Sequence, residues 1–157
     1  MRIEKVKITK YNKIHMIYTQ GSNNQDEYSF TCSEKARPEF YAAMEALAEH
    51  VIDMCELPES YLDRITVRGV SYSYGGEAEV MGAVISASME LKESYQPLNL
   101  TTPHKASAMY NPETPDDDMQ LLTGDCIDAL KALQVECEAY IKGDRAQGSL
   151  FNKEEVA

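Results

Sequence analysis

The sequence predicts an α+β domain with an antiparallel sheet of five or six strands, two main helices and a flexible C-terminal tail. Apolar residues occupy every odd position from 81 to 91, which is the period of a half-buried strand. Two other segments, 38–54 and 123–141, carry apolar residues at helical spacing. A chain of 157 residues suits one domain. We place this domain at residues 1–143 and the flexible tail at 144–157.

Three further strands are expected near the N-terminus. Residues 6–12 and 13–20 form two of them, the second with apolar side chains on both faces. The segment GSNNQD predicts a turn, because its residues tolerate left-handed backbone. Residues 27–33 then alternate apolar and polar side chains, which indicates a strand with one buried face. A short edge strand through Leu98 and Leu100 would complete the sheet.

Two helices are expected, one before and one after the central strands in the sequence. The first starts at Pro38, where the missing N–H costs nothing, and runs for about four turns. Its apolar stripe consists of Phe40, Met44, Leu47, Val51 and Met54. The second runs from a cap at Thr123 or Asp125 to Gly143, which suits the position after a helix end. Its stripe consists of Ile127, Leu130, either Leu133 or Gln134, Cys137 and Ile141.

The strand at 81–91 must pair with the segment before it through a turn at Gly75–Gly76, and the length of this turn decides which side chains face the core. A turn of two residues would put Arg68 on the core face. A turn of three or five residues puts Ile65 and Val67 there instead. We prefer this second register because it buries no charge.

The preferred register creates a second face, on which Arg68, Tyr72 and Tyr74 lie beside small residues of the neighbouring strand. One guanidinium and two aromatic side chains can bind a planar or phosphorylated ligand, such as a nucleotide, or a partner protein. The alternative is an ordinary sheet face that a helix covers or that water hydrates.

Composition restricts the class of protein. The formal net charge is −11, from 15 basic and 26 acidic residues, which argues against direct binding to duplex DNA and favours basic partners. The basic residues are unevenly distributed, because four lysines and no acid lie from Lys5 to Lys13. No apolar run is long enough for a membrane span, and the N-terminus lacks an apolar secretion segment. We therefore expect a cytoplasmic protein whose four cysteines are buried, reduced thiols.

No motif indicates a cofactor, a metal site or a catalytic centre. The three histidines do not stand at metal-ligand spacing from one another or from a cysteine. The acidic run at 116–118 lacks the alternating ligands and glycine of a calcium loop. One enzyme hypothesis stays open, in which Cys55 and His104 meet in three dimensions as a nucleophile and its base. We expect a non-enzymatic protein.

The C-terminal tail contains the sequence Gln147-Gly148-Ser149-Leu150-Phe151. This sequence resembles the pentapeptide through which many bacterial replication and repair proteins bind the ring-shaped sliding clamp, although Gly148 replaces the leucine often found second. The resemblance implies that Leu150 and Phe151 enter an apolar cleft of the clamp and that Gln147 forms a hydrogen bond at its rim. The alternative is that the two apolar side chains dock on the sheet or on a second copy of the chain.

These observations lead to two functional hypotheses. In the first, the chain is a phage or prophage accessory protein of DNA replication, recombination or repair that the tail recruits to the sliding clamp. The rest of the chain resembles small phage and prophage proteins only in the general character of its sequence. In the second, the chain is a phage inhibitor of host defence that blocks a defence protein or sequesters a nucleotide signal through Arg68, Tyr72 and Tyr74. The sequence leaves the oligomeric state open, with a homo-oligomer among the alternatives.

Overall fold

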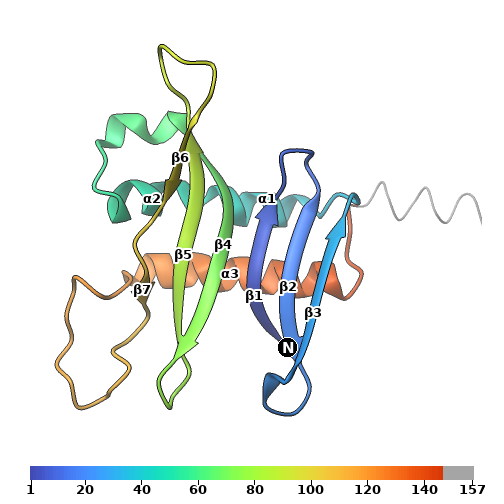
Figure 1. Cartoon of the computed structure of the whole chain (residues 1–157), viewed down its shortest axis with the longest axis vertical. Helices are drawn as coiled ribbons and strands as arrows, with labels where there is room; N and C mark the ends of the chain where they lie inside the picture. Colours follow the sequence, from blue (N-terminus) through green and yellow to red (C-terminus); the bar gives the residue numbers. More distant parts are fainter. Residues whose placement is uncertain (147–157) are drawn as a thin grey trace, which may run out of the picture.

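The computed structural model describes residues 1–146 and has an α+β fold built on a seven-stranded antiparallel sheet (Figure 1). Six strands follow the order β3-β2-β1-β4-β5-β6, and β7 pairs with the same edge of β5 as β6 does. The predicted fold class is therefore confirmed. The strands are β1 Arg2–Ile8, β2 Ile14–Gln20, β3 Asp26–Cys32, β4 Ile65–Gly75, β5 Val80–Met89, β6 Leu98–Thr101 and β7 Lys105–Ala106.

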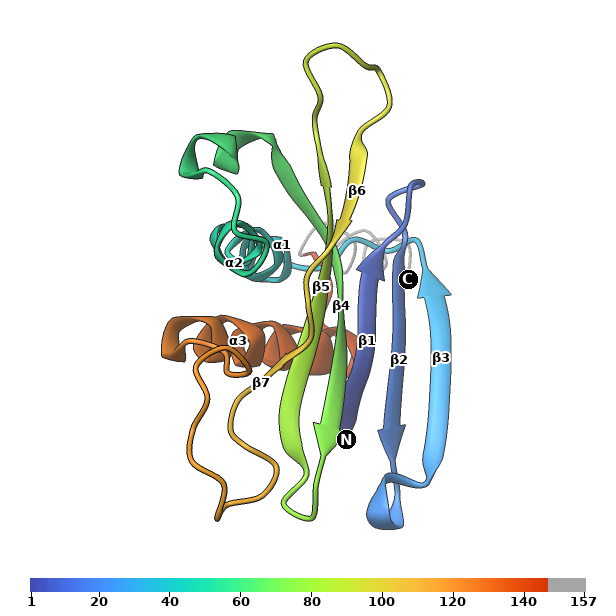
Figure 2. The ribbon, with the colours of Figure 1, turned by 60° about the vertical axis from the view of Figure 1, so that its left-hand side comes forward.

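Three α-helices cover one face of the sheet, and within residues 1–146 no helix covers the other face (Figure 2). The core lies between the sheet and these helices. We call the uncovered side of the sheet the open face. None of the described helices combines the length and the apolar character needed to cross a bilayer. The helices are α1 Pro38–Glu45, α2 Ala48–Met54 and α3 Gly124–Ile141, with short 3-10 turns η1 Ser22–Asn24 and η2 Glu59–Arg64.

The segment 38–54 forms two helices rather than the single helix that the sequence predicted. The backbone tightens where α1 ends, because the N–H of Leu47 donates to the carbonyl of Met44, three residues back. The turn keeps the same side chains inward, so the apolar stripe is still buried. The prediction was therefore wrong about the continuity of the helix and right about its buried face.

The helix α3 begins and ends as the sequence predicts. The hydroxyl of Thr123 accepts a hydrogen bond from the N–H of Cys126 at 3.2 Å and so caps the first turn. Gly143 follows the last turn with a φ of 111°. The buried stripe is rotated slightly from the predicted one and consists of Cys126, Leu130, Leu133, Cys137 and Tyr140.

The strand β4 contains a bulge that the sequence pattern did not predict. Val67 and Gly69 pair with consecutive residues of β5, so Arg68 is an extra residue in β4. The turn that leads into β5 has four residues, 76–79, because Gly75 pairs with Val80. The bulge changes which side chains of β4 face the helices.

The bulge corrects the predicted ligand surface. Ile65 and Val67 face the core, as predicted, and Arg68 does not. Beyond the bulge the alternation is shifted by one residue, so Tyr72 and Tyr74 also lie on the helix-covered side. The prediction that Arg68 shares a face with these two tyrosines is wrong, since it assumed an unbroken alternation along the strand.

The close contact between β1 and β4 accounts for the glycine at the bulge. Lys7 pairs with Gly69 across the two strands. A Cβ atom at position 69 would lie 2.6 Å from the carbonyl oxygen of Val6 and 2.7 Å from the Cβ of Lys7. Only glycine allows this approach without displacing β1.

Residues 144–146, which the sequence assigned to the flexible tail, are held against the domain. The N–H of Asp144 donates to the carbonyl of Ala139 at 2.9 Å, and the N–H of Ala146 donates to the carbonyl of Lys35 at 3.0 Å. The guanidinium of Arg145 lies 3.6 Å from the ring centre of Tyr140. The predicted clamp-binding residues Gln147, Ser149, Leu150 and Phe151 lie outside the described residues.

We predict that Gly69→Ala lowers the free energy of unfolding by about 1–3 kcal/mol, because the added Cβ would overlap β1. Urea denaturation measures this change. Gly124→Ala is the matched control, since a Cβ there meets no atom within 4 Å and alanine suits the first turn of α3. Equal losses of stability in the two variants would contradict the role assigned to Gly69.

Candidate functional site

Polar and basic side chains line the open face of the sheet. Because alternate residues of each strand point away from the helices, the pairings place lysine, histidine and small hydroxyl side chains side by side there. The open face includes Lys5, Lys7, His15, Thr31, Ser71 and Ser86. Two lysines of β1 therefore lie among hydroxyl side chains on the side that no described helix covers.

The β1–β2 turn holds three further side chains at one end of the open face. The hydroxyl oxygen of Thr9 accepts hydrogen bonds from the N–H groups of Tyr11 at 3.3 Å and Lys13 at 3.1 Å. Asn12 adopts a φ of 60°, a left-handed conformation that asparagine tolerates. These constraints fix the backbone from which Lys10, Tyr11 and Lys13 project.

The bulge places Arg68 at the same end of the open face. Its Nε donates to the hydroxyl of Ser88 at 3.2 Å, which orients the guanidinium across the neighbouring strand. Pro97 and Asn99, from the segment that enters β6, lie beside it. The β1–β2 turn and the loop before β6 project from the same end of the sheet (Figure 2).

These elements surround an open hollow of about 730 Å³, which is within the volume range of small-molecule sites. We call it the basic cradle and define it by Lys7, Lys10, Lys13 and Arg68. Among residues 1–146, none of these four cations forms an ion pair with a carboxylate. The rest of the lining is uncharged and consists of Ile8, Thr9, Tyr11, Thr31, Ser88, Pro97 and Asn99.

The chemistry of the basic cradle suits an oxygen-rich anion. Lysine ammonium groups act as point charges toward phosphate, and arginine offers a planar set of donors that matches two phosphate oxygens. Thr31 and Asn99 add uncharged groups that can form hydrogen bonds. The ring of Tyr11 is 72% exposed and provides a surface for stacking.

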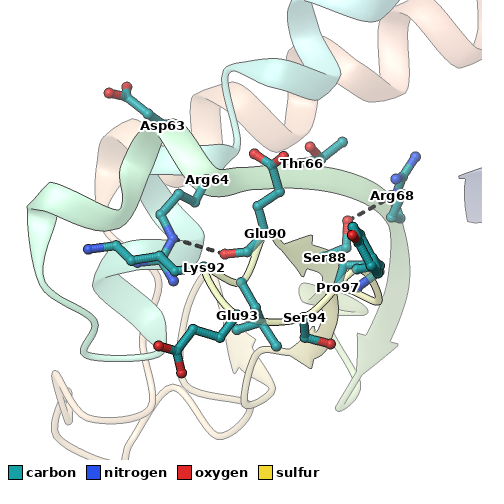
Figure 3. Close-up of a pocket in the computed structure, with 12 residues that line it drawn as sticks. Asp63, Arg64, Thr66, Arg68, Ser88, Glu90, Lys92, Glu93, Ser94 and Pro97 are labelled. Carbon is teal, nitrogen blue, oxygen red and sulfur yellow. Dashed lines mark hydrogen bonds between the residues drawn. The ribbon is translucent and has the colours of Figure 1, made fainter.

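A second hollow adjoins the cradle and is shown in Figure 3. It shares Arg68, Ser88 and Pro97 with the cradle and has a volume of about 870 Å³. The Nε of Arg64 donates to the carbonyl of Glu90 at 2.9 Å and braces its wall. We call it the adjoining hollow, and its remaining lining residues are Asp63, Thr66, Leu91, Lys92, Glu93, Ser94 and Tyr95.

Of the three predicted ligand-binding residues, only Arg68 belongs to the site. The hydroxyl of Tyr72 donates to the carbonyl of Leu130 at 2.8 Å inside the core, and burial raises its pKa. The hydroxyl of Tyr74 donates to the carbonyl of Ile3 at 2.8 Å, and burial raises its pKa to about 12. On the helix-covered side, Tyr72 therefore ties β4 to α3, and Tyr74 ties β4 to β1.

The lysines of the cradle were not predicted as site residues. Their signal was present in the sequence, because the segment from Lys5 to Lys13 has four lysines and no acid. What the sequence lacked was the pairing of β1 with β4, which brings Lys7 beside Gly69 and next to Arg68. The aromatic partner is Tyr11 rather than Tyr72 or Tyr74.

Cys55 and His104 do not form the pair considered for an enzyme. Cys55 packs against the core at the end of α2. His104 lies over Gly82 on the open face, where its Nε2 is 2.8 Å from the hydroxyl of Ser73. The sheet therefore separates Cys55 from His104. Within residues 1–146, no carboxylate hydrogen bond orients the His104 ring, as a catalytic histidine usually requires.

The cysteines and acids give no sign of a metal site in the part of the chain that the structure describes. All four cysteines are free thiols, with Cys126 and Cys137 buried and Cys32 and Cys55 partly exposed. Burial raises the pKa of Cys126 to about 11, so this thiol stays protonated at neutral pH. The prediction of reduced, buried thiols is thus correct for Cys126 and Cys137, whereas Cys32 and Cys55 are free thiols that are only partly buried.

Comparisons with known proteins found no family model that matches the chain, and no significant match to a curated protein or a solved structure. The functional interpretation therefore rests on the residues of the site.

We predict that His15, beside the cradle, titrates below its usual pKa and that inorganic pyrophosphate raises this pKa. Partial burial lowers the pKa of His15, and the charges of Lys7 and Lys5 lower it further. The imidazole is therefore neutral at neutral pH and gains its proton only in more acidic solution. A bound anion would offset the lysine charges, and Lys7→Ala should raise the pKa without any ligand.

The titration of His15 can be followed by NMR of the imidazole signals at a series of pH values, with and without pyrophosphate. His104, which lies elsewhere on the open face, serves as the internal comparison. A pKa of His15 that neither pyrophosphate nor Lys7→Ala changes would contradict the electrostatic arrangement of the cradle.

Proposed function

We propose that this chain is a non-enzymatic binding protein that captures a phosphorylated ligand in the basic cradle. The observation that carries the proposal is the convergence of four cations, none of which forms an ion pair within residues 1–146, in a chain whose net charge is −11. Charged side chains that serve only solubility are usually dispersed among opposite charges. A cluster of one sign in a hollow instead raises the local concentration of the opposite ion.

The surrounding charge restricts the kind of phosphorylated ligand. Duplex DNA presents phosphates over a long surface, and the acidic remainder of the chain would repel most of them. A compact ligand needs only the cradle. The proposal thus keeps the hypothesis, made from the sequence, that the ligand is a nucleotide, and it moves the binding site from Tyr72 and Tyr74 to the cradle. Such a ligand fits a cytoplasmic protein that sequesters a nucleotide signal or serves a nucleotide-dependent process.

We predict that the isolated protein binds tripolyphosphate and that Lys7→Ala and Arg68→Ala each weaken binding about tenfold or more, because each removes a charged hydrogen-bonding group. Isothermal titration calorimetry measures the affinity. Lys131→Ala is the matched control, since Lys131 is an exposed lysine on α3, on the opposite side of the sheet. Undetectable binding, or equal losses in all three variants, would contradict the proposed function.

A second candidate function is recruitment to the bacterial sliding clamp. The specific observation that favours it is the sequence Gln147-Gly148-Ser149-Leu150-Phe151, which directly follows Ala146, the residue hydrogen-bonded to Lys35. A short peptide next to an anchored residue would bind the clamp and so recruit the whole chain to it. The chain would then act as a phage or prophage accessory protein of DNA replication, recombination or repair. This role is compatible with ligand capture in the cradle, because the two use different residues.

We predict that the full chain binds purified sliding clamp weakly, with a dissociation constant around micromolar. Substituting Leu150→Ala and Phe151→Ala together should abolish this binding, since the two side chains supply the apolar contact. Surface plasmon resonance measures the interaction, and tripolyphosphate affinity should stay unchanged in the same variant. Clamp binding that survives the double substitution would rule out the peptide as its cause.

A further inference from the structure

The basic cradle and the adjoining hollow lie side by side at one end of the open face. They share Arg68, Ser88 and Pro97 as a common wall. The hydrogen bond from Arg68 to Ser88 fixes the guanidinium between them, as Figure 3 shows for the side of the adjoining hollow. A ligand held by Arg68 can therefore reach both hollows at once.

The two hollows differ in charge. Among the described residues, four cations and no acid line the cradle, whereas three carboxylates and three basic groups, the shared Arg68 included, line the adjoining hollow. A carboxylate in a ligand site accepts hydrogen bonds and repels phosphate. The two hollows therefore suit the two ends of one ligand, an anionic end and an uncharged end with hydrogen-bond donors. The carboxylates of the adjoining hollow belong to Asp63, Glu90 and Glu93.

The adjoining hollow has the groups that an uncharged ring system would need. Thr66 and Ser94 provide hydroxyls, and the side chain of Glu90 extends toward Thr66 in Figure 3. Ribose hydroxyls and the amino groups of nucleobases are donors that such oxygens accept. Tyr95 is fully exposed at the rim, so its ring is available for stacking against a base.

The extent of the positive surface argues against a long nucleic-acid strand. On one side the cradle borders the carboxylates of the adjoining hollow. On the other side the lysines of β1 give way to Glu4, whose pKa is raised by burial, lowered by the charge of Arg2 and raised by the nearby carboxylate of Glu27, so acids and a base are mixed there. A strand longer than the cradle would place its additional phosphates against these acids. The positive charge is therefore sufficient for a few phosphates only.

We infer that the ligand is a free nucleotide, whose phosphates lie among the cations of the cradle and whose ribose and base lie in the adjoining hollow, with Arg68 between them. This inference rests on the proposed capture of a phosphorylated ligand and adds the chemical class of that ligand. Selectivity then comes from the adjoining hollow, and most of the affinity comes from the cradle.

The test compares three kinds of probe by calorimetry with the full chain: tripolyphosphate, the four common ribonucleoside triphosphates, and oligothymidylates of increasing length. We expect at least one nucleoside triphosphate to bind about tenfold more tightly than tripolyphosphate, because the base adds hydrogen bonds and stacking. We expect the affinity for oligothymidylate to stop rising once the cradle is filled.

Variants separate the two hollows. Thr66→Val should weaken binding of the preferred nucleotide about tenfold and leave binding of tripolyphosphate unchanged. Glu90→Gln should weaken nucleotide binding about tenfold relative to tripolyphosphate, because the lost carboxylate also repelled phosphate. Arg68→Ala should weaken both. Thr66 and Glu90 are both exposed, so variants at these two positions are expected to fold. Glu113→Gln, an exposed carboxylate in the loop after β7, is the matched control for the lost charge.

The outcomes distinguish the inference of a free nucleotide from the proposed capture of a phosphorylated ligand. If tripolyphosphate binds as tightly as every nucleotide, or if affinity continues to rise with strand length, the free-nucleotide inference is wrong and phosphate capture stands. If none of the three kinds of probe binds, both are wrong. Tighter binding of a nucleotide that depends on Glu90 or Thr66, and not on Glu113, supports both.

Discussion

The close approach of β1 and β4 at Gly69 is the contact on which the rest of the structure depends. The N-terminal strands β1, β2 and β3 form one antiparallel unit, and β4 to β7 form another. Only three residue pairs, from Lys5 to Lys7 on β1, join them into one sheet. Because this seam is short, side chains on the helix-covered side reinforce it: the hydroxyl of Tyr74 on β4 bonds to the carbonyl of Ile3 on β1. The helix α3 also crosses behind both units (Figure 1), so its apolar stripe packs against a surface that exists only when the seam is closed.

The same seam assembles the candidate site. Lys7 of β1 lies opposite Gly69 of β4, and the residue before Gly69 is Arg68, which forms the bulge. A regular strand would have placed either this arginine or Tyr72 on the wrong face, whereas the bulge directs Arg68 outward and allows Tyr72 to enter the core. Bulges commonly re-aim a side chain at a functional surface in this way. One irregularity in β4 therefore serves two purposes, since it completes the core on one face and brings a guanidinium beside the lysines of β1 on the other.

The sequence was most informative where a single periodicity ran without interruption. The alternation was sufficient to predict β5 and its core face from Met81 to Met89, although Leu91 lies beyond the strand and is exposed. The spacing after Thr123 was sufficient to predict α3. In β4 the alternation is interrupted once, with Ile65 and Val67 in one phase and Val70 and Tyr72 in the other. The glycine at the interruption was the available sign of a bulge. The cradle could not be predicted by pattern, because long-range strand pairing brings Lys7 and Arg68 to the same hollow, and local periodicity does not encode that pairing.

The acidity of the chain and the basic cradle act over different distances. At physiological ionic strength, charges separated by more than about 8 Å are largely screened. A small anion in the cradle therefore interacts mainly with Lys7, Lys10, Lys13 and Arg68, and the many acids elsewhere contribute little. A long polyanion differs from a small anion, because it would extend beyond the cradle toward the carboxylates of the adjoining hollow. Lowering the ionic strength extends the range of every charge, so the net repulsion of an acidic chain then reaches further and opposes the approach of any polyanion. Under the proposed capture of a phosphorylated ligand, this arrangement would discriminate by the length of the ligand more than by its charge.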